Sequence, residues 1–291
     1  MRIVYVLCSA GRDVYSVMAR VSIASVRLTN PSARVSIMCD AVSEAEMRRI
    51  DDPLLKEMDD IIVRETPPGD ALFRSRFVKT GMRALVDGPF VFLDSDLVVR
   101  GPLDDILATT ADVAGAPNLV KGGQISPRER KMVAAMGWSH REDAYINTGV
   151  LFFSDSDAAH RFGEDWHRKW LEFHGRGIGH RDQPAFNSAL VTVRPRFDVL
   201  PNRFNAQVKA PNESLDGAVI WHYFASMEAA PTTTFELMVR RLLRGEPLDT
   251  QGVEDMIRSS HPWRRDRLLW VNRAKTLGMR VHRRLKSLGR R

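Results

Sequence analysis

Two aspartates one residue apart, Asp94 and Asp96, follow the apolar run Phe90 to Leu93. The run predicts a buried strand, and because side chains alternate along a strand, both carboxylates are expected on the same side, at an exposed turn. Two carboxylates at a strand end favour a hard divalent cation such as Mg²⁺ or Mn²⁺. Such a cation keeps coordination sites open, which a substrate diphosphate usually fills. The alternative for this motif alone is a turn with a helix cap or a surface ion pair.

Strand and helix patterns alternate on both sides of this motif. Strands are predicted at residues 3–8, 34–39, 61–63 and 112–116. Helices are predicted after Asp13, after a capping box of Ser43 with Glu46, and after Asp70. This alternation predicts an α/β fold with a mostly parallel sheet covered by helices on both faces. Ligands bind such sheets at the carboxyl ends of the strands, where Asp94 and Asp96 are expected.

Length and composition fit a soluble globular protein. The 291 residues suffice for one large α/β domain or two modest ones, with 44% hydrophobic and 27% charged residues. No stretch reaches the roughly 20 apolar residues of a transmembrane helix, so a cytoplasmic location is expected. Cys8 and Cys39 lie at the ends of predicted strands without metal-site spacing, which indicates reduced core thiols.

Basic residues concentrate at the C-terminus. Residues 258–291 hold twelve Lys and Arg against one acid, so this tail carries +11 and residues 1–257 carry −4 of the net +7. Apolar residues, among them Trp263 and Trp270, interleave with the arginines. The pattern predicts a cationic amphipathic helix that lies on an anionic membrane surface. Nucleic-acid binding and a solvated helix packed on the body are the alternatives, and no nucleic acid is expected as a partner.

Four segments together resemble the GT-A glycosyltransferases of family 8, which includes glycogenin and bacterial lipooligosaccharide galactosyltransferases. The segments are residues 2–9 with 30–37, residues 91–103 around Asp94-Ser95-Asp96, residues 145–153 with Asn147-Thr148-Gly149, and residues 182–187 followed by Leu200-Pro201-x-x-Phe204-Asn205 and Trp221-His222-Tyr223. The resemblance spans roughly residues 1–225, and the order and spacing of the segments make it more specific than any single motif.

The resemblance implies that Asp94, Asp96 and His222 hold Mn²⁺ or Mg²⁺ on the diphosphate of a nucleotide sugar. Imidazole is an acceptable manganese ligand beside carboxylates. An isolated histidine in the place of His222 would be an ordinary half-buried strand residue. The ordered motifs upstream favour the ligand instead.

The resemblance also places Asn147, Asp182 and Gln183 around the donor sugar, with Gln183 beside the anomeric carbon and Asp182 on sugar hydroxyls. A glutamine is a poor nucleophile, so no firm covalent intermediate is expected, and retention is what the family implies. Asp182 could equally cap a helix that starts at Gln183-Pro184. Both roles can hold together.

Further donor contacts are expected from Arg76 and Lys79, which share one helix face, and from Cys8 and Ser95. A solvated face is the alternative for the two basic residues. Relatives continue after their metal histidine with a Gly-x-x-Lys-Pro-Trp pattern, in which the lysine contacts the diphosphate. No lysine follows His222 here within that distance, so a second phosphate anchor is not predicted.

Three regions and one activity are therefore expected: a GT-A catalytic domain at 1–225, an extension at 226–257 and the basic tail at 258–291. The activity is metal-dependent transfer of a hexose from a UDP-sugar, UDP-glucose or UDP-galactose, with retention. The acceptor is a saccharide or glycolipid of cell-surface polysaccharide or lipopolysaccharide synthesis, reached from the inner face of the membrane. The rivals are a haloacid-dehalogenase-type phosphatase, which also has an Asp-x-Asp after an apolar strand, and a non-catalytic binder of membrane or nucleic acid.

Overall fold

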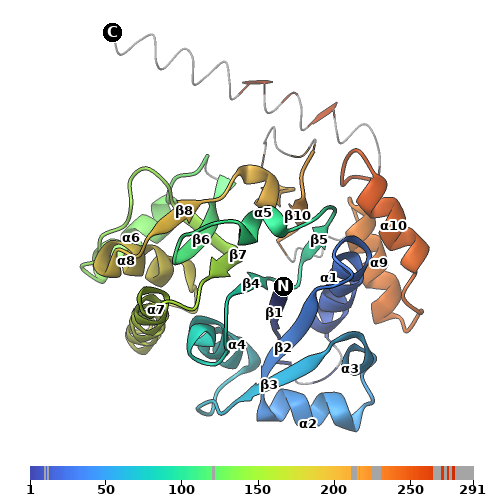
Figure 1. The fold of residues 1–291 in the computed structure, drawn as a ribbon, viewed down its shortest axis with the longest axis horizontal. Helices are drawn as coiled ribbons and strands as arrows, with labels where there is room; N and C mark the ends of the chain where they lie inside the picture. The colour runs from blue at the N-terminus through green and yellow to red at the C-terminus, as the bar shows by residue number, and fades with distance from the viewer. Residues whose placement is uncertain are drawn as a thin grey trace.

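The computed structural model describes residues 1–264, apart from 10, 12, 120, 121, 211–214, 216 and 225–230, together with residues 270, 271, 274, 277 and 278. Its centre is a seven-stranded sheet in the order β3-β2-β1-β4-β7-β6-β8 (Figure 1). The strands are β1 (Arg2–Val6), β2 (Arg34–Asp40), β3 (Asp60–Arg64), β4 (Phe90–Leu93), β6 (Val113–Pro117), β7 (Ile146–Phe153) and β8 (Phe197–Val199). Only the pairings of β7 with β4 and with β6 are antiparallel, which confirms the predicted mixed, mainly parallel sheet.

Helices cover both faces of this sheet because alternate strand residues point to opposite sides. Ile3 and Tyr5 of β1 belong to one buried cluster, and Val4 between them belongs to another. The first cluster includes residues of α1 (Val14–Thr29), and the second includes residues of α4 (Ala71–Thr80), α7 (Asp157–Gly175) and α8 (Gln183–Val193). The shorter elements are α2 (Ala41–Arg49), α3 (Leu54–Glu57), η1 (Met82–Ala84), α5 (Asp104–Leu107), α6 (Pro127–Ala135) and η3 (Asn202–Asn205).

Side-chain caps fix where the first helices begin. The Asp13 carboxylate accepts from the backbone N–H groups of Tyr15 and Ser16 at the start of α1, as predicted. The predicted capping box of Ser43 with Glu46 is wrong. Strand β2 runs as far as Asp40, and the carboxylate of Asp40 accepts from the Ser43 N–H, so α2 begins before the expected cap.

A smaller three-stranded sheet stands beside the larger one. It contains β5 (Leu97–Val99), β10 (Ile220–His222) and β9 (Ala206–Gln207), with β10 central and antiparallel to β5. His222 lies opposite Leu97 in this pairing. Because β4 belongs to the larger sheet and β5 to the smaller, the segment Asp94-Ser95-Asp96 is the crossing between the two.

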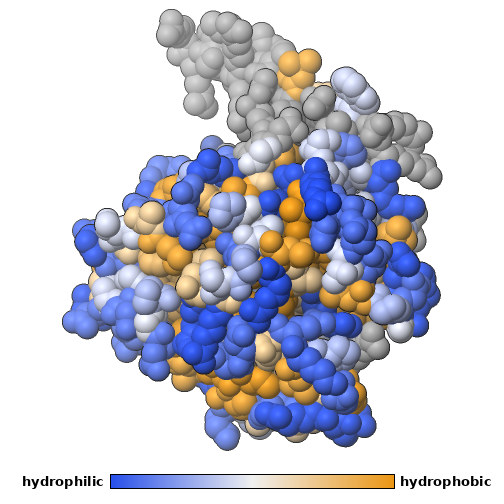
Figure 2. All heavy atoms as spheres, turned by 45° about the vertical axis from the view of Figure 1, so that its right-hand side comes forward, coloured by the Kyte–Doolittle hydropathy of each residue, from blue (hydrophilic) through white to orange (hydrophobic). Residues whose placement is uncertain are grey.

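The C-terminal helices pack against the other side of α1. Helices α9 (Thr234–Leu243) and α10 (Thr250–Arg258) share a buried cluster with Val17 and Val21 of α1 and with Trp221. Trp263 forms an isolated bridge with Thr233, so the ordered packing reaches beyond residue 258. Most of the predicted amphipathic tail lies outside the described residues. No described helix is long and apolar enough to cross a membrane. Hydrophilic side chains cover much of the face in Figure 2, and apolar ones form small groups.

Candidate active site

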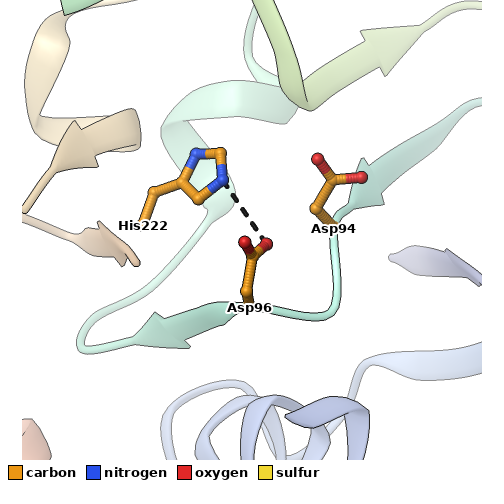
Figure 3. Close-up of side chains that lie close together, drawn as sticks. All are labelled: Asp94, Asp96 and His222. Atoms are coloured by element: carbon orange, nitrogen blue, oxygen red, sulfur yellow. Dashed lines mark ion pairs between the residues drawn. The ribbon is translucent and has the colours of Figure 1, made fainter. Parts of the chain in front are cut away.

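Asp94, Asp96 and His222 converge where the two sheets meet (Figure 3). One ligand atom from each lies within 4.8 Å of the others. Asp94 and Asp96 lie between β4 and β5 rather than on a strand, so the turn of the crossing, and not strand alternation, brings their carboxylates together. Asp96 is 7% exposed, which shows that the turn is less open than predicted.

The imidazole of His222 has a fixed orientation. Its Nδ1 lies 2.8 Å from Oδ1 of Asn205, which can only accept, so Nδ1 donates this hydrogen bond and Nε2 is the ring nitrogen that faces Asp96. Nε2 lies 3.4 Å from Oδ1 of Asp96. Burial disfavours the charged form of Asp96, but the adjacent His222 outweighs it and holds the pKa of Asp96 below its usual value. Two carboxylates and one imidazole nitrogen in this arrangement fit Mn²⁺ or Mg²⁺.

A hydrogen-bonded chain connects His222 to Gln183. The amide nitrogen of Asn205 donates to Oδ1 of Asn147 at 2.9 Å, and the amide nitrogen of Asn147 donates to Oε1 of Gln183 at 3.4 Å. Gly149 leaves space for this chain, because a Cβ there would lie 2.5 Å from Cε1 of His222. The predicted metal side and the predicted sugar side of the site are therefore coupled by buried amides.

The ammonium group of Lys79 joins two carboxylates of the site. It lies 2.9 Å from Oδ1 of Asp94 and 3.0 Å from Oδ2 of Asp182, with 2% of its side chain exposed. Arg76, on the same face of α4, has Nε 3.7 Å from Oδ1 of Asp182. The solvated alternative is therefore wrong for Lys79.

The carboxylate of Asp182 bonds residues of the site and not the backbone of α8. It accepts from the Thr148 hydroxyl at 2.9 Å and makes no capping hydrogen bond to α8, so the predicted capping interaction is wrong. Burial alone would raise the pKa of Asp182, but Lys79 and Arg76 outweigh it and hold that pKa well below its ordinary value. Asp182 is an anion held in place on two sides.

One cavity of about 860 Å³ contains all the predicted site residues in its wall. They are Cys8, Arg76, Lys79, Asp94, Ser95, Asp96, Asn147, Asp182, Gln183 and His222. Burial raises the pKa of the Cys8 thiol to about 12, so Cys8 contributes a neutral wall and not a nucleophile. The volume of the cavity lies in the range of small-molecule binding sites.

Solved structures share this arrangement of sheets and helices. The galactosyltransferase LgtC, in complex with donor and acceptor sugar analogues, superposes with a TM-score of 0.54 at 16% identity, over 84% of this chain and 94% of LgtC. Mouse xyloside xylosyltransferase 1 matches with a TM-score of 0.53 at 15% identity, over 77% of this chain and 97% of its own. GlyE of Streptococcus pneumoniae TIGR4 matches with a TM-score of 0.53 at 15% identity, over 91% of this chain and 66% of the GlyE chain. The chain has the GT-A glycosyltransferase fold.

No protein-family model and no curated protein matches the sequence. Three residues that shape the site lie outside the predicted set. Thr148 lines the cavity, Gly149 leaves room for His222, and Asn205 bonds its imidazole. In the sequence only their positions inside the Asn-Thr-Gly segment and the Phe204-Asn205 pair marked them. The cavity also continues past Gln183 to Asn118, Ser126, Arg128, Glu129 and Arg181. No pattern in the sequence indicated this second end.

Proposed function

We propose that this protein is a metal-dependent glycosyltransferase that moves a hexose from a UDP-sugar to a saccharide or glycolipid acceptor. The observation that carries the proposal is the single cavity in which residues from four distant segments meet, with Asp94, Asp96 and His222 within ligand distance of one another. The GT-A fold and the sugar analogues bound by LgtC support the same reading.

In this proposal each group has a task set by its position. Asp94, Asp96 and His222 hold a divalent cation, which when bound neutralises the charge of the leaving diphosphate. Asp182, ionised and fixed by Lys79 and Thr148, accepts hydrogen bonds from sugar hydroxyls. Gln183, oriented by Asn147, lies beside the reacting carbon. Cys8, Ser95 and Arg76 complete the donor wall.

Retention, UDP-glucose or UDP-galactose as donor, and action at the membrane through the basic tail belong to this proposal. The reaction leaves the nucleotide diphosphate as a dianion or trianion while the sugar gains oxocarbenium character, so a site rich in fixed charges suits it. A phosphatase of the haloacid-dehalogenase type is the rival that uses the same acidic pair.

The deciding experiment compares nucleotide sugars in the presence of Mn²⁺. A donor at 100 times its Kd is expected to stabilise the folded protein by about 2.7 kcal/mol, and the same donor should be hydrolysed slowly without acceptor. The double substitution D94N/D96N should abolish both effects. The matched control D104N/D105N neutralises an adjacent acidic pair in the first turn of α5, outside the cavity, and should keep them.

Undiminished hydrolysis by D94N/D96N, or in excess chelator, would contradict the metal role. Failure of every nucleotide sugar to stabilise the protein, together with release of phosphate from simple phosphate esters, would favour the phosphatase.

A further inference from the structure

The cavity has a second end that the donor proposal leaves unused. Beyond Gln183 its wall is formed by Asn118, by the first turn of α6 and by Arg181, the residue just before Asp182. The proposed function assigns the metal ligands and Asp182 to the donor and gives no task to these residues. This end of the cavity is therefore left free for the other substrate.

Two arginines and one carboxylate give this end an excess of positive charge. Arg181 Nη1 lies 3.2 Å from Oε1 of Glu129, whose side chain is 4% exposed. Oε2 of Glu129 accepts from the Ser126 hydroxyl at 2.7 Å, so both oxygens of the carboxylate are engaged. The guanidinium of Arg128, in the first turn of α6, forms no hydrogen bond or ion pair with any residue that the structure describes. The negative charge of Asp182 is already balanced by Lys79 and Arg76, so it does not offset the positive charge of the two arginines.

Both arginines lie at the positive ends of helices. Arg128 is the second residue of the nine-residue α6, and Arg181 immediately precedes the residue that leads into the eleven-residue α8. A cation at a helix N-terminus is destabilising, because the unpaired N–H groups there already favour negative charge. Two such placements around one cavity are expected where an anion binds.

Asn118 supplies an independent sign that a ligand belongs at this end. Its side-chain oxygen lies buried in the cavity wall and accepts no hydrogen bond from the described residues. A buried acceptor without a donor costs stability, and a rotation of the Asn118 amide toward the cavity would let a hydroxyl of a bound saccharide satisfy it.

We propose that the acceptor of this enzyme is a saccharide that carries an anionic substituent, a carboxylate or a phosphate, which Arg181 and Arg128 bind. Glu129 fixes one nitrogen of Arg181 and leaves the others for the substituent in a two-pronged contact. The inference rests on the proposed function, because it assigns the acceptor of that same site.

Binding of three sugars to the enzyme loaded with Mn²⁺ and UDP tests the proposal. Glucose is the neutral probe, glucuronate carries a carboxylate and glucose 6-phosphate carries a phosphate. Calorimetry should show at least one anionic sugar binding tenfold or more tightly than glucose, and the better of the two identifies the substituent. Equal affinities, or no detectable binding of either anionic sugar, would overturn the proposal.

Variants locate the effect. R128Q should lose most of the anionic preference, and so should R181Q/E129Q, which removes the ion pair as a unit and leaves no buried carboxylate unpaired. R130Q is the matched control, since Arg130 is an exposed arginine of the same helix that lies 3.8 Å from Glu142 and outside this cavity. A preference that survives both cavity variants, or is lost in R130Q, would also overturn it.

Hydrolysis of the UDP-sugar, measured in the same variants without acceptor, separates the two proposals. It should persist in R128Q and R181Q/E129Q. If the wild-type protein hydrolyses no UDP-sugar, the proposed function fails, and if it hydrolyses donor but shows no charge preference, only the acceptor inference fails.

Discussion

Replacing Gly149 by alanine should damage the metal site through a single methyl group. A Cβ at this position would lie 2.5 Å from Cε1 and 3.0 Å from Nδ1 of His222, and 2.9 Å from Oδ1 of Asn147. Ordinary contacts begin near 3.4 Å, so the imidazole would have to retreat by about 1 Å. His222 has little freedom to do so, because Nδ1 is bonded to Asn205 and its ring stacks on Phe224 with centroids 4.3 Å apart.

Two magnitudes follow for G149A. Overpacking a buried site costs about 1–3 kcal/mol, so the free energy of unfolding should fall by that amount. Metal sites tolerate ligand shifts of only about 0.2 Å, so Mn²⁺ affinity should fall at least tenfold, and donor hydrolysis with it. Urea unfolding measures the first effect, and a Mn²⁺ titration followed by electron paramagnetic resonance measures the second.

Gly115 provides the matched control on the same sheet. A Cβ there would lie 2.8 Å from Cγ2 of Ile146 and 3.0 Å from Cδ2 of Leu151, which is similar crowding against apolar groups away from His222. G115A should therefore lose comparable stability and retain Mn²⁺ affinity. Wild-type Mn²⁺ affinity in G149A, or an equal loss in G115A, would refute the assignment of Gly149 to the metal site.

Three further changes test other parts of the structure. N205L removes the acceptor that fixes Nδ1 of His222, so Mn²⁺ affinity should fall about 10–100-fold. N205D can accept the same hydrogen bond and should restore part of that affinity. Equal Mn²⁺ affinities in the two variants would contradict the role of Asn205 in orienting His222. Burial, and then the charge of Arg64, lower the pKa of His167 to about 4, so on acidification the unfolded state takes up this proton first. The free energy of unfolding should therefore fall by roughly 3 kcal/mol as the pH drops from about 6.5 to 4. In urea unfolding, H167Q should lose less stability than the wild type by that amount over this pH range, and the same pH dependence in both proteins would contradict the role of His167. Removal of residues 265–291 spares the Thr233–Trp263 bridge, so donor hydrolysis should stay intact while sedimentation with anionic vesicles is abolished. Undiminished sedimentation of the truncated protein would mean that the tail is not the membrane anchor.

The sequence by itself determined the fold class and one part of the cavity wall. Alternating hydrophobic patterns gave the strands and helices because each element must bury one face, as on β1, where Ile3 and Val4 enter opposite clusters. Asp94, Asn147, Gln183 and His222 could be selected because their residue types and order follow motifs that lie at strand ends or, for Gln183, at the start of a helix.

Tertiary structure alone decided how these groups act on one another. The partners of Lys79, one just after β4 and one just before α8, lie 15 and 103 residues away along the chain, so no local pattern could indicate that it joins Asp94 to Asp182. Pairing of β10 with β5 set His222 beside Asp96, and Asn205 then fixed which ring nitrogen faces the aspartate. The arginine-rich end of the cavity exists only because the first turn of α6 and the start of α8 meet there. Long-range packing, which places charges without regard to their distance in sequence, thus determined the electrostatics of the site.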